Sequence, residues 1–475
     1  MLFSQQVFLV AGLSRSGVSA AEFLLSRGAK VYAYDDAEGE SVQKAIVSLS
    51  EQGCRIVHRE ELSERAKECD ILVLSPGIPI DHPLARFFRT HGKRVTGEME
   101  LGALALACPA VAVTGTNGKT TTVTMLERIF RVAGKECFAC GNSGFPLTAA
   151  AQKLKSGGVA AVEVSSFQLE TLSSLRPHVA VVLNIAEDHL DRHYNMENYI
   201  YLKRKLLKNC TESEYAVLDR DDPVVRSFAE HTKARVVWFS SKERAEGAYL
   251  EDDHLCFKGE KVLSTDDLSV RGEHNLANAL AAVAAAKLMG VGNDAIASAL
   301  SSFKGVSHRL EKVLEKDGVI YIDDSKATNV DSCLKAVAGL DRETVLLIGG
   351  KEKGEQFGPL FSALKRSRVV HAVLFGECAF RLMNAAMEEN FTAVTLCRPF
   401  EVAVNVACLT ARPGQNVLLS PAAASFDEFR SFEERGEKFA SLVKAYAESS
   451  FATEAAAGDA DGERGETGKE DRSLD

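Results

Sequence analysis

One short segment combines glycine, lysine and threonine in a spacing that suits phosphate chemistry. Val111–Thr122 reads VAVTGTNGKTTT, so an apolar run leads into a glycine turn and then into Lys119 and three threonines. Backbone N–H groups of such a turn, together with a helix N-terminus, converge on phosphate oxygens. The lysine adds a point charge for the β- and γ-phosphates, and the hydroxyl after it can reach Mg²⁺. The segment predicts a nucleoside triphosphate site, with a chance glycine turn as the alternative.

Two further residues could hold a metal ion beside that triphosphate. Glu163 ends an apolar run, a position that suits a hard oxygen ligand of Mg²⁺. His189 lies in EDHLDRH, close to three acids and a second histidine. The alternatives are a capping or salt-bridged carboxylate at Glu163 and a solvated or hydrogen-bonded imidazole at His189. Together with the phosphate segment, both residues become candidate metal ligands.

Three other loops carry polar residues at the ends of predicted strands. Tyr321–Asn329 reads YIDDSKATN, where Lys326 could bind an anion or lie in a surface turn. Gly349–Gly354 reads GGKEKG, a second glycine loop that bears lysines. Gly12–Gly17 reads GLSRSG, similar to a dinucleotide-binding turn, but Ser14 replaces the glycine that lets the backbone approach a pyrophosphate. A structural turn, a site for another nucleotide's diphosphate and the NAD site of an oxidoreductase all stay open there.

Alternating strands and helices would position these loops. The apolar runs predict buried strands of parallel sheets, and ligands gather at the carboxyl ends of such strands, where Glu163, Asn184 and His189 fall. The pattern predicts an α/β protein with three domains, each with a mainly parallel sheet, at residues 1–97, 98–304 and 305–450. The predicted strands are Val7–Ala11, Val31–Tyr34, Ile71–Leu74, Ala160–Val164, Val179–Leu183, Val319–Ile322, Val345–Ile348, Ala372–Phe375 and Val417–Leu419.

Composition limits the classes of function. The chain has 475 residues, of which 46% are hydrophobic, so it can bury the cores of several domains. Its net charge is −10, and the segment after Phe451 alone contains eight acids and three bases. That segment is rich in Ala and Gly and predicts a disordered tail at 451–475. The remaining body is only mildly acidic, which argues against a nucleic-acid surface.

The sequence also predicts where the protein works. It shows no signal peptide and no apolar run of membrane-spanning length. Its eleven cysteines are scattered, as expected of reduced thiols. Cys137 and Cys140 form a lone C-x-x-C, which we expect to pack in the core rather than to bind a metal. We expect a cytoplasmic enzyme that does not bind a membrane.

Seven motifs, in order, resemble those of the Mur ligases, which join amino acids to UDP-linked muramyl precursors. They span nearly all of the chain except the tail, and SSFQLE with HLDRH points to the branch that adds D-glutamate. The motifs are TGTNGKTTT (Thr114–Thr122), EVSSFQLE (Glu163–Glu170), NIAEDHLDRH (Asn184–His193), GEHNLANALAA (Gly272–Ala282), HRLE (His308–Glu311), DDSKATN (Asp323–Asn329) and SPAAASFDEF (Ser420–Phe429).

The resemblance implies a Rossmann-like first domain that binds UDP, a central P-loop ATPase domain and a Rossmann-like last domain that binds the amino acid. It implies an ATP- and Mg²⁺-dependent ligase that joins D-glutamate to UDP-N-acetylmuramoyl-L-alanine. The reaction would pass through an acyl phosphate, release ADP and phosphate, and serve peptidoglycan synthesis. We expect a monomer. A sister ligase for another amino acid and a nucleotide-dependent switch without an amide product are the alternatives.

The roles of family residues transfer to the matching positions. For the UDP substrate these are Arg15, Ser16, Asp36, Ser75, Asn142 and Ser165. For ATP they are Gly115, Thr116, Asn117, Gly118, Lys119, Thr120, Thr121, Asn275, Arg309 and Asp324. For D-glutamate they are Lys326, Thr328, Lys353, Ser425 and Phe432. For magnesium they are Thr120, Glu163, His189 and Lys203, and the catalytic set is Lys119, His189, Lys203 and Lys326.

Lys203 has a special role in this family pattern, because the lysine at its position is carbamylated and becomes an anionic oxygen ligand. The reaction with CO₂ needs a neutral amine, and the pKa of a lysine moves readily on burial. Several cations lie on the same basic helix, so Lys205 is an alternative. The chain departs from the pattern at Asp323, where Asn is usual, in the turn Cys140–Ser143, and at Asp36-Ala37, which lacks a basic residue. The fine contacts to UDP therefore stay open.

Overall fold

The structure is a computed structural model, and it describes residues 3–37, 39–270, 272–351, 354 and 356–462. The chain divides into two compact units, Met1–Val306 and Ser307–Asp475, here called the first and second units. The first unit contains two sheets and the second unit contains one. In the part of the chain that the structure describes, no helix is both long and apolar enough to cross a membrane.

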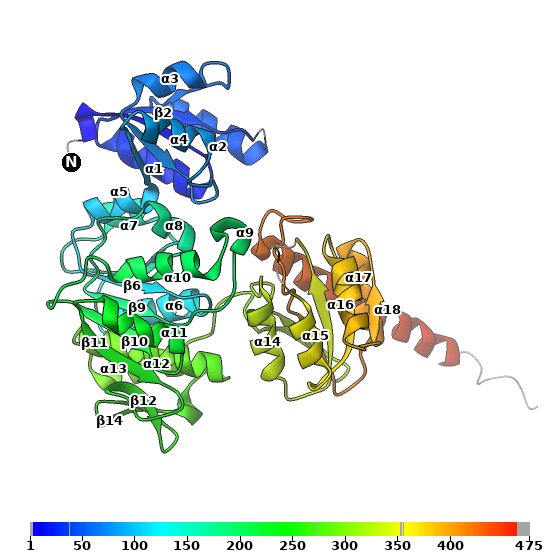
Figure 1. Cartoon of the computed structure of the whole chain (residues 1–475). Coiled ribbons are helices and arrows are strands. Elements are labelled where there is room, and N and C mark those ends of the chain that lie inside the picture. The colour runs from blue at the N-terminus through cyan, green and yellow to red at the C-terminus, as the bar shows by residue number, and fades with distance from the viewer. Residues whose placement is uncertain (1–2, 38, 271, 352–353, 355, 463–475) are drawn as a thin grey trace, which may run out of the picture. The chain divides into compact units, whose positions relative to one another are not determined.

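The first sheet is a five-stranded parallel sheet in the order β3-β2-β1-β4-β5 (Figure 1, blue). Its strands are β1 (Val7–Ala11), β2 (Lys30–Tyr34), β3 (Arg55–Ile56), β4 (Ile71–Leu74) and β5 (Arg94–Gly97). Its helices are α1 (Arg15–Ser26), α2 (Glu40–Glu51), α3 (Leu62–Glu68) and α4 (Pro83–Thr90). Phe8 and Val10 pack in one core cluster, whereas Leu9 and Ala11 pack in another. Because successive strand residues face opposite sides, this division shows that both faces of the sheet are covered.

The second sheet has nine strands in the order β14-β13-β12-β11-β10-β9-β6-β8-β7 (Figure 1, cyan to green). Strands β6 to β12 pair in parallel, and β12, β13 and β14 form an antiparallel edge. The strands are β6 (Ala110–Thr114), β7 (Cys137–Gly141), β8 (Val159–Glu163), β9 (Val179–Val182), β10 (Tyr215–Asp219), β11 (Arg235–Ser240), β12 (Gly247–Glu251), β13 (His254–Phe257) and β14 (Glu260–Ser264). The helices are α5 (Glu98–Ala105), α6 (Lys119–Val132), α7 (Leu147–Lys153), α8 (Ser166–Thr171), α9 (Leu190–His193), α10 (Met196–Arg204), α11 (Pro223–Ser227), α12 (Glu273–Leu288) and α13 (Asn293–Ser301).

The third sheet lies in the second unit and has the order β15-β16-β20-β17-β18-β19. All of its pairs are parallel except the antiparallel pair of β15 and β16. The strands are β15 (Glu311–Lys316), β16 (Val319–Asp323), β17 (Thr344–Gly349), β18 (Val369–Phe375), β19 (Val394–Leu396) and β20 (Asn416–Leu419). The helices are α14 (Val330–Ala338), α15 (Gly358–Leu364), α16 (Ala379–Glu388), α17 (Phe400–Thr410) and α18 (Phe432–Gly462).

The predicted α/β class with mainly parallel sheets is confirmed, and each predicted strand lies within two or three residues of an observed one. Cys137 and Cys140 are buried free thiols in β7, as expected of core packing. Strands β3, β5, β7, β10–β15 and β19 were not predicted. Within the expected tail, α18 continues to Gly462, and the residues after it lie outside those described.

Candidate active site

The glycine loop predicted for the triphosphate joins β6 to α6. Gly115 has φ +148° and Gly118 has φ +85°, and only glycine takes such angles without strain. A Cβ added to Gly118 would lie 2.1 Å from Oδ1 of Asn278, a buried residue of α12. The loop is therefore held closely against α12, and its shape depends on the absence of side chains at both glycines.

Asn184, which follows β9, fixes the loop from the neighbouring strand. Its backbone oxygen accepts a hydrogen bond from Thr116 N at 2.9 Å. Its side-chain Oδ1 accepts from Asn117 N at 2.8 Å, and its Nδ2 donates to Asn117 O at 3.1 Å. Thr116 Oγ1 lies 3.0 Å from the hydroxyl of buried Tyr199. These contacts hold the loop in shape from the middle of the sheet.

Lys119 and the threonines that follow it begin helix α6. Lys119 Nζ donates to the backbone oxygens of Gly115 at 2.9 Å and Thr116 at 2.7 Å, so the lysine side chain folds back along the loop. Thr120 is half-buried and Thr121 is buried in the first turn of this helix. The ammonium group and the helix N-terminus thus lie together at the carboxyl end of β6, which suits an anionic phosphate chain.

Lys203 reaches the same loop from α10. Its side chain is buried, and its Nζ donates to Gly115 O at 2.8 Å. Burial, and next the nearby Lys119 ammonium, hold the pKa of Lys203 well below its usual value, against opposing effects of Asp188 and Glu163. The lowered pKa favours the neutral amine at this position.

Lys205, the alternative, lies in a different environment. Its Nζ donates to the backbone oxygen of Leu169 and, at 3.4 Å, to that of Glu170, both in α8. Burial lowers the pKa of Lys205 as well, with Lys208 as the next cause. The hydrogen bonds of Lys205 described here thus lie at α8, whereas that of Lys203 lies at the phosphate loop.

Glu163 ends β8, next to β6 in the sheet, as the sequence predicts. Asn142 Nδ2 donates to its Oε1 at 2.8 Å, whereas its Oε2 is buried and accepts no hydrogen bond from the residues that the structure describes. A buried carboxylate oxygen without a donor is costly unless a cation or another donor reaches it. The oxygen chemistry and this unpaired atom fit a magnesium ligand.

His189 precedes α9 and has a left-handed backbone, with φ +56°. Its Nε2 lies 3.5 Å from Asp188 Oδ2, and its ring lies 4.7 Å from that of Phe167. The second histidine of the motif, His193, is buried and lies 2.9 Å from Ser166 Oγ, and burial lowers its pKa to about 4. His193 is therefore a neutral core residue near pH 7, and His189 is the more exposed of the two.

Asp188 is a buried acid that sequence reasoning did not select. It precedes His189 and acts electrostatically on Lys203, as does Glu163. Its place in EDHLDRH was the one available signal, but three acids share that segment. The structure thus groups Lys119, Lys203, Glu163 and Asp188 around the start of the phosphate loop.

Two of the residues predicted to bind UDP, Arg15 and Ser16, lie directly after the turn that follows β1. An open groove of about 760 Å³ is lined there by Leu13, Arg15, Asp35 and their neighbours. Asp35 Oδ2 accepts from Leu13 N at 2.5 Å, while Asp36 accepts from the Tyr34 hydroxyl. Asp35 lines the groove, and the role of Asp36 at the uracil stays a prediction. Ser16 lies in the first turn of α1.

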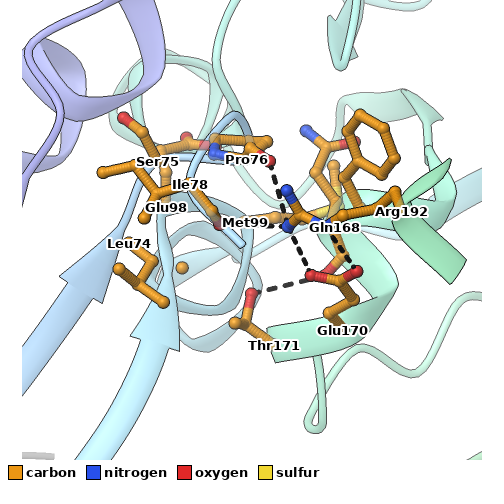
Figure 2. A pocket seen from close by; sticks show the side chains of 12 residues that line it. Leu74, Ser75, Pro76, Ile78, Glu98, Met99, Gln168, Glu170, Thr171 and Arg192 are labelled. Atoms are coloured by element: carbon orange, nitrogen blue, oxygen red, sulfur yellow. Dashed lines mark hydrogen bonds and ion pairs between the residues drawn. The ribbon is translucent and has the colours of Figure 1, made fainter. Parts of the chain in front are cut away.

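One contact joins this turn to the middle sheet, because Arg15 Nη2 donates to Asn142 O at 3.2 Å. Within the first domain, Ser75 Oγ donates to Gly12 O at 2.7 Å. Ser165 caps α8 in a reciprocal arrangement with Gln168. Figure 2 shows a small pocket that both domains line, with Ser75 and Pro76 from the first and Gln168 and Arg192 from the second. Arg15 and Asn142, two of the residues predicted to bind the UDP substrate, thus meet between the first domain and the middle sheet, and the roles of the whole set stay a prediction.

The second unit brings together its own predicted residues. Arg309 Nη1 lies 3.8 Å from Asp324 Oδ1, and Ser420 Oγ donates to Asp324 Oδ2 at 2.8 Å. Burial raises the pKa of Asp324 to about 6 despite these partners. Lys326 Nζ lies 4.6 Å from the centre of the Phe432 ring. Thr328 donates its N–H to Lys326 O at 2.9 Å, and Ser425 is buried, whereas Lys353 lies outside the described residues.

Asn275, predicted at the adenine, lies in the first unit, in the first turn of α12.

Arg435 connects the loops of the second unit, and sequence reasoning missed it. It is fully buried, and burial lowers its pKa to about 10, so the guanidinium stays charged at neutral pH. Its acceptors are Ser325 Oγ at 3.1 Å, Ser325 O at 2.9 Å, Gly349 O at 3.4 Å, Ala423 O at 3.2 Å and Ala424 O at 3.1 Å. These acceptors adjoin Lys326 and Ser425. In sequence, Arg435 is one charge among many in FEERGEK, and no pattern distinguishes it.

Comparisons with known proteins match nearly the whole chain. Three family models match it: "Mur ligase MurD-like, N-terminal domain" at residues 6–97, "Mur ligase middle domain" at 113–286 and "Mur ligase, glutamate ligase domain" at 308–423. The UDP-N-acetylmuramoylalanine–D-glutamate ligase of Pelotomaculum thermopropionicum is 43% identical over 453 residues, which cover 93% of this chain and 98% of that protein. The enzyme of that name from Streptococcus mutans is 37% identical over 446 residues, with 93% and 98% covered.

Solved structures share the fold at lower identity. The UDP-N-acetylmuramate–alanine ligase MurC of Thermotoga maritima gives a TM-score of 0.63 at 18% identity and covers 93% of this chain and 99% of that one. The MurF ligase of Thermotoga maritima, solved in complex with ADP, gives a TM-score of 0.58 at 18% identity, with 94% and 98% covered.

Proposed function

The chain belongs to the Mur ligase family, in its D-glutamate-adding branch, and we propose how its residues share the reaction. The enzyme is an ATP-dependent ligase that joins D-glutamate to UDP-N-acetylmuramoyl-L-alanine in peptidoglycan synthesis. The observation that carries the assignment of its site is the convergence of Lys119, Lys203 and Glu163 at the loop after β6. We place the reaction in the cytoplasm, where ATP and UDP-linked precursors meet, and we propose a monomer.

The first step activates a poor electrophile. A carboxylate oxygen of the UDP substrate attacks the γ-phosphorus of ATP, the bond to the β-phosphate oxygen breaks, and ADP leaves. Lys119, the N–H groups of Gly115 and Gly118 and the start of α6 stabilise the charge that moves between the phosphates. Thr120 and Thr121 contribute hydroxyls, and Asn275, Arg309 and Asp324 complete the contacts to ATP.

Magnesium fits this site, with Thr120, Glu163, His189 and carbamylated Lys203 as the residues that would hold it. The buried unpaired Oε2 of Glu163 supports this proposal. Bound magnesium supplies positive charge that neutralises the transferring phosphoryl group.

Carbamylation of Lys203 would supply the anionic ligand. The neutral Nζ attacks the carbon of CO₂, an N–C bond forms, and one proton leaves to solvent. The buried position and lowered pKa of Lys203 support this step, because the amine loses its proton readily there.

The second step forms the amide. The neutral amine of D-glutamate attacks the acyl carbon, phosphate leaves, and the nitrogen gives up a proton. His189 is the candidate acceptor of this proton when it does not hold metal. The amino acid would be bound by Lys326, Thr328, Lys353, Ser425 and Phe432. Of these residues, Lys326 would also be catalytic. Water must be excluded, because an acyl phosphate hydrolyses readily.

The UDP substrate would lie in the groove of the first domain. We propose that Arg15 and Ser16 bind its diphosphate, that Asp36 and Ser75 bind the nucleotide, and that Asn142 and Ser165 bind the muramyl-peptide. The open groove at Arg15 and its junction with Asn142 support this assignment.

A substrate panel tests the function. Purified enzyme receives ATP, Mg²⁺ and UDP-N-acetylmuramoyl-L-alanine with D-glutamate, L-glutamate or other amino acids, and the amide product and phosphate are measured. We expect stoichiometric product and phosphate with D-glutamate only. Equal rates with L-glutamate, or phosphate release without the UDP substrate, would overturn the assignment. A preference for a different amino acid would identify a sister ligase.

A further inference from the structure

Two residues of the motifs SSFQLE and HLDRH have no part in the reaction described above. They are Glu170, in α8, and Arg192, in α9, and the structure pairs them. Arg192 Nε lies 3.0 Å from Glu170 Oε1, and Arg192 Nη2 lies 2.6 Å from Glu170 Oε2. The side chains are only 10% and 7% exposed. The pair is therefore a two-pronged ion pair that is largely removed from water, a geometry that lysine cannot reproduce.

The same guanidinium holds a loop of the first domain. Arg192 donates to three successive backbone oxygens, those of Pro76 at 3.4 Å, Gly77 at 3.4 Å and Ile78 at 3.0 Å. These residues follow Ser75, which we propose to bind the nucleotide of the UDP substrate. Figure 2 shows the dashed contacts running from Pro76 through Arg192 to Glu170 across the pocket. One side chain thus joins the Ser75–Ile78 loop to helices α8 and α9.

Phe167 connects this pair to the proposed metal ligand. The Arg192 guanidinium lies 4.8 Å from the centre of the Phe167 ring, and the His189 ring lies 4.7 Å from it. His189 and Arg192 are three residues apart, at the start of α9 and inside it. The orientation of His189 is therefore linked, through one short helix and one aromatic ring, to the loop that carries Ser75.

We propose that the Arg192–Glu170 pair holds the Ser75–Ile78 loop in position for the UDP substrate and fixes the position of this loop relative to His189. The proposal rests on the proposed site of the UDP substrate. Glu170 fixes the plane of the guanidinium. The second N–H of Arg192 Nη2, shared between Pro76 O and Ile78 O, and an N–H of Nη1 to Gly77 O then hold the loop. Neither side chain acts on the reacting atoms, so both are positioning residues. Loss of the planar guanidinium should loosen the loop and weaken binding of the UDP substrate. The ATP loop should keep its own contacts to Asn184.

The test compares three variants of the full-length enzyme. Arg192→Lys keeps the charge and removes the fork, and Glu170→Gln keeps an acceptor oxygen and removes the ion pair. Arg176→Lys is the matched control, because Arg176 pairs with Glu214 at 2.8 Å in the same unit, where neither residue lines the pocket. Dissociation constants for UDP-N-acetylmuramoyl-L-alanine and for ATP are measured by calorimetry, together with the thermal unfolding midpoint of each variant.

We expect Arg192→Lys and Glu170→Gln each to raise the dissociation constant of the UDP substrate by at least about tenfold. The dissociation constant of ATP should change by less than about threefold. The affinity of the double variant for the UDP substrate should fall much less than the product of the two single effects, because both substitutions remove the same ion pair. Arg176→Lys should leave both affinities unchanged. Unchanged affinity for the UDP substrate, equal losses for both ligands, or multiplicative losses would overturn the proposal. A wild-type enzyme that forms no amide with D-glutamate would instead overturn the proposed function, and the binding result would stand apart from it.

Discussion

At the scale of single residues, two lysines separated by one position have different surroundings. Lys203 points its Nζ at Gly115 O of the phosphate loop, whereas Lys205 donates to backbone oxygens of α8. Burial lowers the pKa of both, and each has two acids as electrostatic neighbours, Asp188 and Glu163 for Lys203 but Glu170 and Glu100 for Lys205. A carbamate on Lys203 would bring negative charge to the phosphate loop, and one on Lys205 would not.

We therefore expect Lys203→Ala to lower kcat by at least about a hundredfold, because it removes a charged group from the site of phosphoryl transfer. Formate or acetate should restore part of the activity by replacing the missing carboxylate. Lys205→Ala is the matched control and should keep kcat within several-fold, without rescue. Steady-state rates with and without the acids check this. Rescue of Lys205→Ala, or no rescue of Lys203→Ala at any acid concentration, contradicts the assignment.

The sequence alone could not reveal the importance of charged residues that lie among other charged residues. Lys119 and Glu163 could be predicted because each follows an apolar strand, where a charge has a clear reason. Arg435 and Asp188 lie among other charges, where solvation is the ordinary explanation. Their burial arises from tertiary packing, which no local pattern reports.

At the scale of elements, the start of α6 depends on a close approach to α12. Gly118 has φ +85°, and a Cβ there would lie 2.1 Å from Asn278 Oδ1. Gly134, which follows the same helix, has φ +75° and no atom within 4 Å of an added Cβ. Substitution by alanine would therefore strain the backbone at both positions, and only at Gly118 would the added Cβ also collide with another residue.

We expect Gly134→Ala to cost about 1 kcal/mol of unfolding free energy and to leave the KM for ATP unchanged. Gly118→Ala should cost at least about 1 kcal/mol more and raise the KM for ATP, because the loop must move away from Asn278. Chemical denaturation and initial rates measure both effects. Equal losses in the two variants would mean that Asn278 yields freely and that the loop does not need this approach.

The elements that could be predicted are the fully buried parallel strands. Val179–Val182 and Ile71–Leu74 are continuous apolar runs with every residue buried, so periodicity and composition agree. Strands at the sheet edge could not be predicted in this way. Glu260–Ser264 and Glu311–Lys316 contain more polar than apolar side chains, and pairing with a neighbouring strand decides their conformation.

At the scale of the whole molecule, the hydrophobic cores separate at Val306. Among the described residues, each core cluster lies wholly within one unit: the clusters around the first two sheets in Met1–Val306 and those around the third sheet in the second unit. The proposed residues of the UDP substrate and the phosphate loop belong to the first unit, and all of those for D-glutamate belong to the second.

A fragment of residues 1–306 should therefore fold and bind without completing the reaction. We expect it to unfold cooperatively, because its cores need no residue of the second unit, and to bind UDP-N-acetylmuramoyl-L-alanine within about threefold of the full chain. ATP should bind more weakly, since Arg309 and Asp324, which we propose to bind ATP, are missing, and no amide should form at any D-glutamate concentration. Calorimetry and a product assay measure these properties. A fragment without a cooperative transition would show that the first unit depends on the second for its fold, and amide formation would remove the second unit from the proposed amino-acid site.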